Sequence, residues 1–265
     1  MSSAGYRANV TGVDIGWWGL AASIVPMVVV AGISLRRRLG LERSLAEATV
    51  RAVAQLVLAG WALTLLLDGD TPMVWAWAWV VAMVPAAGDA ARRREPRLAG
   101  LGWMTAVGAS LGLGVSLATV FALGILPLEA RVLVPVSGMV VGNSLKVVVV
   151  AATRLVDGLR DRVGEVEALL ALGFRPAWAV RDIASDALRL ALLPQIETTR
   201  SVGVVFLPGA LTGLILAGVD PIQAALVQAA LLFLILGTAA VTGLVVVFFG
   251  VRVFLTDDQR LVPPT

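Results

Sequence analysis

Seven long runs of apolar residues divide this sequence, and they limit the folds open to it more than any other feature. An α-helix rises about 1.5 Å per residue, so about 20 apolar residues cross the hydrocarbon core of a bilayer. A helix also satisfies its own backbone hydrogen bonds, as lipid requires. The sequence therefore predicts an all-α, polytopic integral membrane protein with about seven transmembrane helices. The predicted spans are residues 17–35, 45–67, 73–91, 101–126, 132–152, 198–217 and 221–254.

The composition agrees with lipid as the surrounding medium. Hydrophobic residues make up 58% of the 265 residues and charged residues 15%, whereas a soluble domain has about 25% charged residues. The chain contains no cysteine and no histidine, which excludes disulfides, thiolate metal sites and histidine base catalysis. The arginines flank the apolar runs, where anionic lipid headgroups lie. Membrane lipid, and not nucleic acid, is the predicted partner of these charges.

The arginines also predict the orientation of the spans. Sixteen arginines fall in the loops and the C-terminal end on one side, including the cluster Arg36–Arg38, and only Arg7 and Arg131 fall on the other. Positive residues concentrate on the cytoplasmic side of membrane proteins. The N-terminus is thus expected outside and the C-terminus in the cytoplasm, which requires an odd number of spans. The first run is expected to be a retained span, because its charges follow it and a signal peptide carries them in front.

One long polar segment, residues 153–194, falls on the predicted cytoplasmic side. Its first helix is expected over residues 157–172, where Val163, Val166 and Leu169 recur on one face. Gly173 is expected to end that helix and Pro176 to open a second one. We therefore expect one permease-like membrane domain over residues 1–265, with this helical segment in the cytoplasm.

The chain lacks the G-x-x-x-x-G-K-[ST] loop that cradles nucleotide phosphates, so it is not expected to be an enzyme or to bind a cofactor itself. ATP-driven transport would need a separate ATPase subunit. Residues 167–173, EALLALG, are loosely similar to the ATPase-docking loop of ABC importer permeases. An amphipathic helix lying on the membrane surface is the alternative reading. The residues predicted to couple to an ATPase are Glu165, Glu167, Gly173, Arg175, Arg181 and Asp182.

Polar side chains inside the predicted spans are candidates for a transport path. Such groups need partners or a water-filled route at membrane depth. The path residues predicted here are Gln55, Asn143 and Glu197, and Met139 is a further candidate ligand. The alternative is that these groups only hydrogen-bond between helices. Glu197 and Arg200 are one turn apart and are expected to pair.

Glycine and proline add two signals. Gly138 with Gly142, and Gly209 with Gly213, have the spacing that lets helix backbones approach closely. Pro208 and Gly209 interrupt the sixth run and predict a helix break at membrane depth. Broken helices of this kind are common at transport sites.

Several stretches make the sequence similar to a known family. Residues 133–143 read LVPVSGMVVGN, residues 169–176 read LLALGFRP and residues 199–221 read TRSVGVVFLPGALTGLILAGVDP, with Arg181-Asp182 and Leu193-Pro194 between the last two. With Arg51 and Gln55 upstream, this pattern resembles the Fet-type permeases of bacterial iron-exporting ABC transporters, whose plant relatives are aluminium-tolerance permeases. The likeness extends from about residue 41 to residue 254. It implies a multi-pass protein of a bacterial plasma (inner) membrane, assembled from two permeases and two ATPase subunits that bind ATP.

The resemblance favours iron or another metal cation as the exported substrate and leaves the metal ligands unknown. Lys146 lies one turn from Asn143, and its charge would repel a passing metal ion. An ABC permease for a non-metal substrate, such as a nucleotide sugar, stays open as an alternative. A transporter driven by an ion gradient would need carboxylates deep in the spans, and the sequence offers none there. A non-transporting membrane subunit would need a large exposed domain.

Overall fold

Helices account for nearly all of the described chain. The computed structural model describes residues 17–66, 72–255 and 261–262, and within these residues it contains α-helices joined by short turns and no multi-residue strand. The helices group into two units, Met1–Thr71 and Pro72–Thr265. The predicted all-helical membrane fold is confirmed. Within the described residues, four helices are long and apolar enough to cross a membrane: Met73–Arg94, Leu101–Ala122, Ala130–Asp161 and Pro221–Val253.

The first unit contains α1 (Trp17–Ser23), α2 (Val25–Arg37) and α3 (Glu42–Leu66). The first predicted span is therefore not one continuous helix. Pro26 lies in the first turn of α2 and has no backbone N–H to donate to the preceding turn, so the helix is interrupted at Ile24. At 25 residues, α3 is long enough to span a bilayer and carries Gln55. A total of seven spans and their orientation stay predictions.

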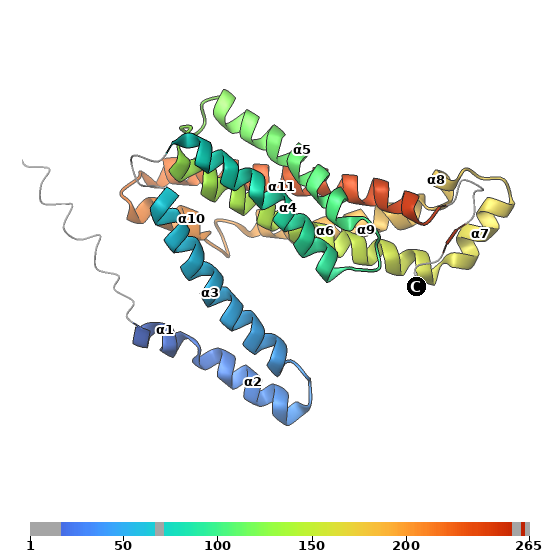
Figure 1. The fold of residues 1–265 in the computed structure, drawn as a ribbon, viewed down its shortest axis with the longest axis horizontal. Coiled ribbons are helices and arrows are strands. Elements are labelled where there is room, and N and C mark those ends of the chain that lie inside the picture. Colours follow the sequence, from blue (N-terminus) through green and yellow to red (C-terminus); the bar gives the residue numbers. More distant parts are fainter. Residues whose placement is uncertain (1–16, 67–71, 256–260, 263–265) are drawn as a thin grey trace, which may run out of the picture. The chain divides into compact units, whose positions relative to one another are not determined.

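The second unit is an elongated helical bundle (Figure 1). The helix α11 (Pro221–Val253) packs against α5 (Leu101–Ala122), α6 (Ala130–Asp161) and α9 (Arg181–Ser201), and α4 (Met73–Arg94) packs against α5 and α6. The short helices α7 (Val163–Ala171) and α8 (Pro176–Ala179) connect α6 to α9, and α10 (Gly209–Leu216) precedes α11. Aspartate 220 caps α11, because Asp220 Oδ1 accepts hydrogen bonds from the N–H groups of Ile222 and Gln223.

The structure changes two predicted boundaries. The helix expected over residues 157–172 is divided at Arg162, so that α6 ends at Asp161 and α7 turns Val166 into the core. The helix α9 continues through Pro194 to Ser201, so the sixth run does not begin a new helix at Thr198. The backbone then leaves the helix over residues 202–208, with Gly203 at a φ of +88°, and α10 begins at Gly209.

The helices α5 and α11 pack closely at two glycines that were not among the predicted packing pairs. A Cβ atom on Gly112 would lie 2.7 Å from Thr238 Cγ2, and one on Gly108 would lie 2.9 Å from Thr242 Cα. Thr238 Oγ1 also donates to the carbonyl oxygen of Gly112. The predicted pairs behave differently: Gly142, Gly209 and Gly213 face open space within the described structure, and Gly138 meets only Met83 Cε at 3.6 Å. The prediction that these glycine pairs allow close helix packing was wrong for contacts within the described chain.

Replacing Gly112 with valine is expected to destabilise the bundle by about 1–3 kcal/mol, because the added carbons overlap α11. Gly114 is the matched control, since it lies two residues further along α5, on another face of the helix, with open space around it. The measurement is the apparent unfolding temperature of the detergent-solubilised proteins. Equal temperatures for Gly112→Val and Gly114→Val would contradict the close α5–α11 contact.

Candidate functional site

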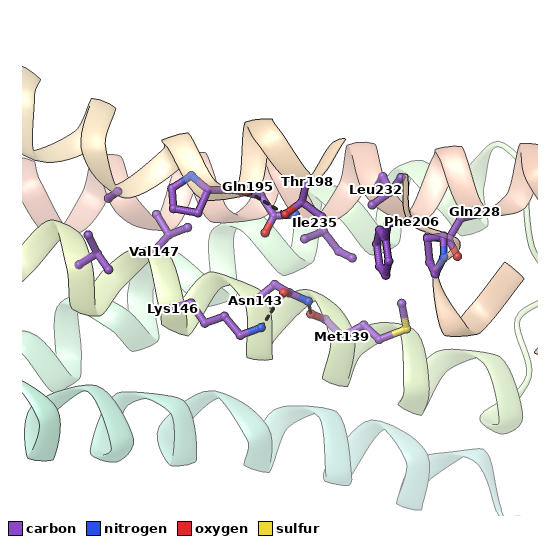
Figure 2. A pocket seen from close by; sticks show the side chains of 14 residues that line it. Met139, Asn143, Lys146, Val147, Gln195, Thr198, Phe206, Gln228, Leu232 and Ile235 are labelled. Atoms are coloured by element: carbon purple, nitrogen blue, oxygen red, sulfur yellow. Dashed lines mark hydrogen bonds between the residues drawn. The ribbon is translucent and has the colours of Figure 1, made fainter. Parts of the chain in front are cut away.

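A pocket of about 430 Å³ lies among α6, α9, α11 and the segment before α10. We call it the α6–α9–α11 pocket. Figure 2 shows Asn143 and Lys146 on α6 facing the α9 residues Gln195 and Thr198. The lining is mostly apolar with a few convergent polar groups, which is the usual composition of a small-molecule site. The lining residues are Met139, Asn143, Lys146, Val147, Val150, Ala191, Pro194, Gln195, Thr198, Phe206, Pro208, Gln228, Leu232 and Ile235.

Two α6 side chains form a short chain of hydrogen bonds along the pocket. The Nδ2 atom of Asn143 donates to the carbonyl oxygen of Met139 at 2.8 Å, and Lys146 Nζ donates to Asn143 Oδ1 at 3.4 Å. Lys146 is exposed and lies near the middle of the 32-residue α6. Its ammonium group therefore reaches toward the N-terminal half of the helix, away from the end that is predicted to be cytoplasmic. Side chains in helices favour this direction.

The α9 and α11 walls supply further polar groups. Thr198 Oγ1 donates to the carbonyl oxygen of Pro194 at 2.8 Å, which satisfies the hydroxyl hydrogen within the helix. Gln228 is only 3% exposed, and its Oε1 atom has no hydrogen-bond partner among the described residues. A buried amide oxygen without a partner is costly. Gln228 is therefore the lining group most in need of a donor from a bound molecule or water.

The structure brings together some of the predicted path residues and separates others. Asn143 and Met139 line the pocket, as does Pro208 at the helix break, whereas its neighbour Gly209 begins α10 outside the lining. Glu197 is not in the lining; it is exposed and pairs with Arg200 at 2.8 Å, as its spacing predicted. Gln55 lies on α3 in the first unit.

Besides Lys146, three polar lining residues were not among the predicted path residues. Gln195 and Thr198 belong to α9, and Gln228 is one of two glutamines early in α11. The sequence shows that these residues are polar, but it does not show that their side chains face the same pocket. Among the described residues, no group of three or more Asp or Glu residues is placed to hold a metal ion.

The turn between α7 and α8 presents apolar side chains to the surroundings. Gly173, with a φ of +85°, ends α7: its N–H donates to the carbonyl of Leu170, and the N–H of Phe174 donates to that of Leu169. The rings of Phe174 and Trp178 stack with centroids 4.4 Å apart, and Leu172 is 76% exposed. We call Leu172, Phe174 and Trp178 the turn surface. Exposed apolar patches of this kind mark interaction sites.

The predicted coupling residues occupy different sides of this segment. Glu165 accepts from Arg162 at 2.6 Å, and this hydrogen bond holds the pKa of the Glu165 carboxyl below its ordinary value. Arg175 and Arg181 instead line a second cavity, of about 880 Å³, together with Arg252 of α11. The remaining predicted residues, Glu167 and Asp182, are exposed.

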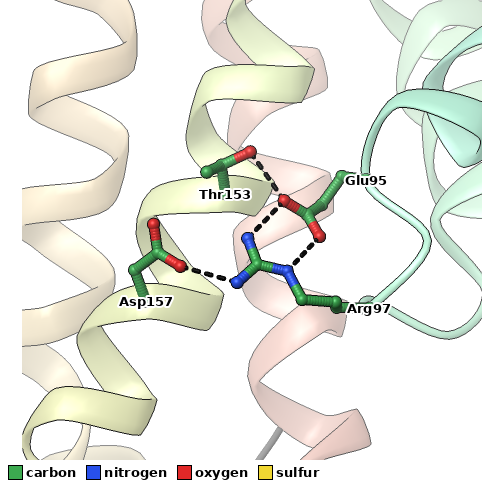
Figure 3. Close-up of polar contacts among 4 residues, drawn as sticks. All are labelled: Glu95, Arg97, Thr153 and Asp157. Atoms are coloured by element: carbon green, nitrogen blue, oxygen red, sulfur yellow. Dashed lines mark hydrogen bonds and ion pairs between the residues drawn. The ribbon is translucent and has the colours of Figure 1, made fainter. Parts of the chain in front are cut away.

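An ion-pair network joins the α4–α5 loop to α6 (Figure 3). Arg97 donates to both carboxylate oxygens of Glu95 and to Asp157 Oδ1, each at 2.8 Å, and Thr153 Oγ1 donates to Glu95 Oε2. Glu95 is 3% exposed. The Arg97 guanidinium lowers the pKa of the Glu95 carboxyl, although burial opposes this change. The network fixes the loop that leads into α5.

Comparison with known proteins places this architecture in a family. The model of the family described as "Uncharacterised protein family (UPF0014)" matches residues 17–255. The chain belongs to the UPF0014 family. No solved structure matches it significantly.

Members of the UPF0014 family resemble this chain over almost their whole length. The membrane protein YjkA of Bacillus subtilis is 31% identical over 91% of this chain and 96% of its own, and the rice membrane protein STAR2 is 32% identical over 91% and 84%. The probable iron export permease protein FetB of Escherichia coli is 27% identical over 92% and 93%. The predicted family resemblance is thus confirmed, and the chain is a multi-pass membrane protein of a family that includes a probable permease.

Proposed function

We propose that this chain is the membrane-spanning permease subunit of an ABC transporter, which exports iron or another metal across the plasma (inner) membrane of a bacterium. The observation that carries the proposal is Lys146, an exposed cation near the middle of a membrane-spanning helix. A charge facing lipid there costs several kcal/mol, about 2.5–3.5 on insertion scales. The α6–α9–α11 pocket beside it therefore serves as a water-filled part of a transport path. The name of the relative FetB supports metal export.

The turn surface is the proposed contact with the ATPase. Leu172, Phe174 and Trp178 present apolar area at the predicted cytoplasmic end, while Val166 of α7 and Ile183 of α9 are buried in the core of the bundle. A push on the turn is therefore transmitted to packed helices. ATP binding and hydrolysis by the partner would favour different conformations of this subunit, which is how an ATPase drives transport without a site in the permease.

A second copy of the chain is the proposed partner within the membrane. On α6, the residues Gly142, Lys146 and Val150 are exposed along one face, and Gly142 has open space around it. Small residues allow another helix to approach closely. Covering this face with a second copy would remove Lys146 from lipid and enclose the pocket between the two permeases.

Alanine at both Phe174 and Trp178 is expected to abolish association with the ATPase, because it removes the stacked pair of the turn surface. The experiment purifies the tagged chain from its native membrane and identifies a partner that contains the G-x-x-x-x-G-K-[ST] loop. It then measures iron transport in inverted vesicles with and without ATP. We expect the partner and ATP-dependent transport in the parent protein, and loss of both in the double variant.

Leu128→Ala is the control, since Leu128 is an exposed apolar residue between α5 and α6, on the predicted outer side. It should retain both the partner and transport. A chain that purifies alone and transports equally well after ATP depletion would overturn the proposed function. The ion-gradient alternative would then be favoured.

A further inference from the structure

The α6–α9–α11 pocket has an unbalanced charge. Among its lining residues, Lys146 is the single ionisable group, and no carboxylate lies beside it. The carboxylate of Glu197 is outside the lining and is paired with Arg200 at 2.8 Å. The described wall of the pocket therefore carries one positive charge, and that charge is not neutralised by the protein.

The Lys146 ammonium group is held within the membrane part of α6. Its one described hydrogen bond is the long contact of 3.4 Å to Asn143 Oδ1, one turn toward the N-terminus of α6. A lysine that escaped to the cytoplasmic interface would extend in the opposite direction. A charge at membrane depth needs an opposite charge or strong hydrogen-bond acceptors. In this pocket an anionic ligand would supply the negative charge that the lining residues lack.

The other polar groups suit an oxygen-bearing organic ligand better than a bare metal ion. Asn143, Gln195 and Gln228 carry neutral amides and Thr198 a hydroxyl, and Gln228 Oε1 lacks a donor. A ligand hydroxyl would satisfy that oxygen. Divalent and trivalent metal ions in proteins are held mainly by carboxylates, histidine or cysteine, and no such group lines this pocket. A volume of about 430 Å³ accommodates a small organic molecule.

We propose that the α6–α9–α11 pocket binds a carboxylate- or phosphate-bearing anion, and that Lys146 selects its charge. This inference rests on the proposed function, because it takes the pocket as part of the transport path. The anion has two possible sources. It is either the chelate in which a metal ion crosses the membrane or a metal-free organic acid or phosphate.

Equilibrium binding to the purified full-length chain in lipid nanodiscs tests the proposal. The probes are citrate, inorganic phosphate, ferric citrate and Fe²⁺ alone, at constant ionic strength. We expect at least one anionic probe to bind, and Lys146→Gln to weaken it roughly ten- to hundredfold, the usual value of a charged hydrogen bond. Lys146→Arg should restore most of the affinity. Tighter binding of ferric citrate than of citrate identifies the chelate, and equal or weaker binding identifies the metal-free anion.

Arg200→Gln is the matched control, because it removes one positive charge near the pocket without changing the lining. It should leave anion binding unchanged. The inference is overturned if no anionic probe binds at millimolar concentration, if both variants weaken binding equally, or if Fe²⁺ alone binds and does so better after Lys146→Gln. Binding needs no ATPase, so any of these results would leave the association with an ATPase partner to be judged separately.

Discussion

Replacing Arg97 with alanine is expected to destabilise the second unit by about 3–5 kcal/mol, because it leaves the buried Glu95 carboxylate without its cation. Arg97 makes two hydrogen bonds to Glu95 and one to Asp157, so one substitution breaks the link between the α4–α5 loop and α6 (Figure 3). Thermal unfolding of the detergent-solubilised protein measures the loss. An accompanying fall in membrane expression is also expected.

Arg93 provides the control for this substitution. It pairs with Asp89 at the same kind of distance, 2.7 Å, but its side chain is 75% exposed. Exposed ion pairs contribute at most about 1 kcal/mol, so Arg93→Ala should change the unfolding temperature little. Similar losses for Arg93→Ala and Arg97→Ala would show that the Glu95 network has no special structural role.

The same network predicts how stability depends on pH. The pKa of Glu95 is lowered in the folded protein from its ordinary value of 4.5. A carboxyl of this kind stabilises the fold above its unfolded pKa, and the contribution is lost as the pH falls through the folded pKa. The parent protein should therefore lose stability below about pH 4.5 more steeply than the variant Glu95→Gln, which lacks the titrating group.

Much of the fold could be predicted because it depends on local sequence. Apolar length predicted α4, α5, α6 and α11, and the glycine and proline at positions 173 and 176 predicted the turn between α7 and α8. The errors concern properties that depend on contacts between residues far apart in the sequence. Gly112 was missed because its role depends on Thr238, 126 positions along the chain. The predicted start of the sixth span at Thr198 was wrong, because α9 continues through Pro194 to Ser201.

The candidate site could be predicted only in part for the same reason. Asn143 was found because it is a polar side chain inside an apolar run, and Met139 because its thioether is a candidate metal ligand. Glu197 has the chemistry of a path residue, but its position on α9 directs it to Arg200 and away from the pocket. Gln228 could be identified only from the structure, in which its amide oxygen is buried and has no hydrogen-bond partner among the described residues. The spacing of residues along the sequence does not show which helix faces contact each other.

The central claim is that water reaches the α6–α9–α11 pocket within the membrane. The chain has no cysteine, so one introduced thiol gives an unambiguous signal. Asn143→Cys places it in the pocket, and Val115→Cys places it on α5 at a site that is 65% exposed within an apolar span. A thiol reacts as its thiolate, which forms in water and not in lipid.

The decisive measurement is the labelling rate of each thiol by a charged, membrane-impermeant reagent in inverted membrane vesicles and in intact cells. On at least one side of the membrane, Asn143→Cys is predicted to react roughly tenfold faster or more than Val115→Cys, because only the first thiol ionises in water. Equal, slow labelling of both thiols from both sides would mean that lipid or packed protein surrounds Asn143, and would contradict a transport path through this pocket.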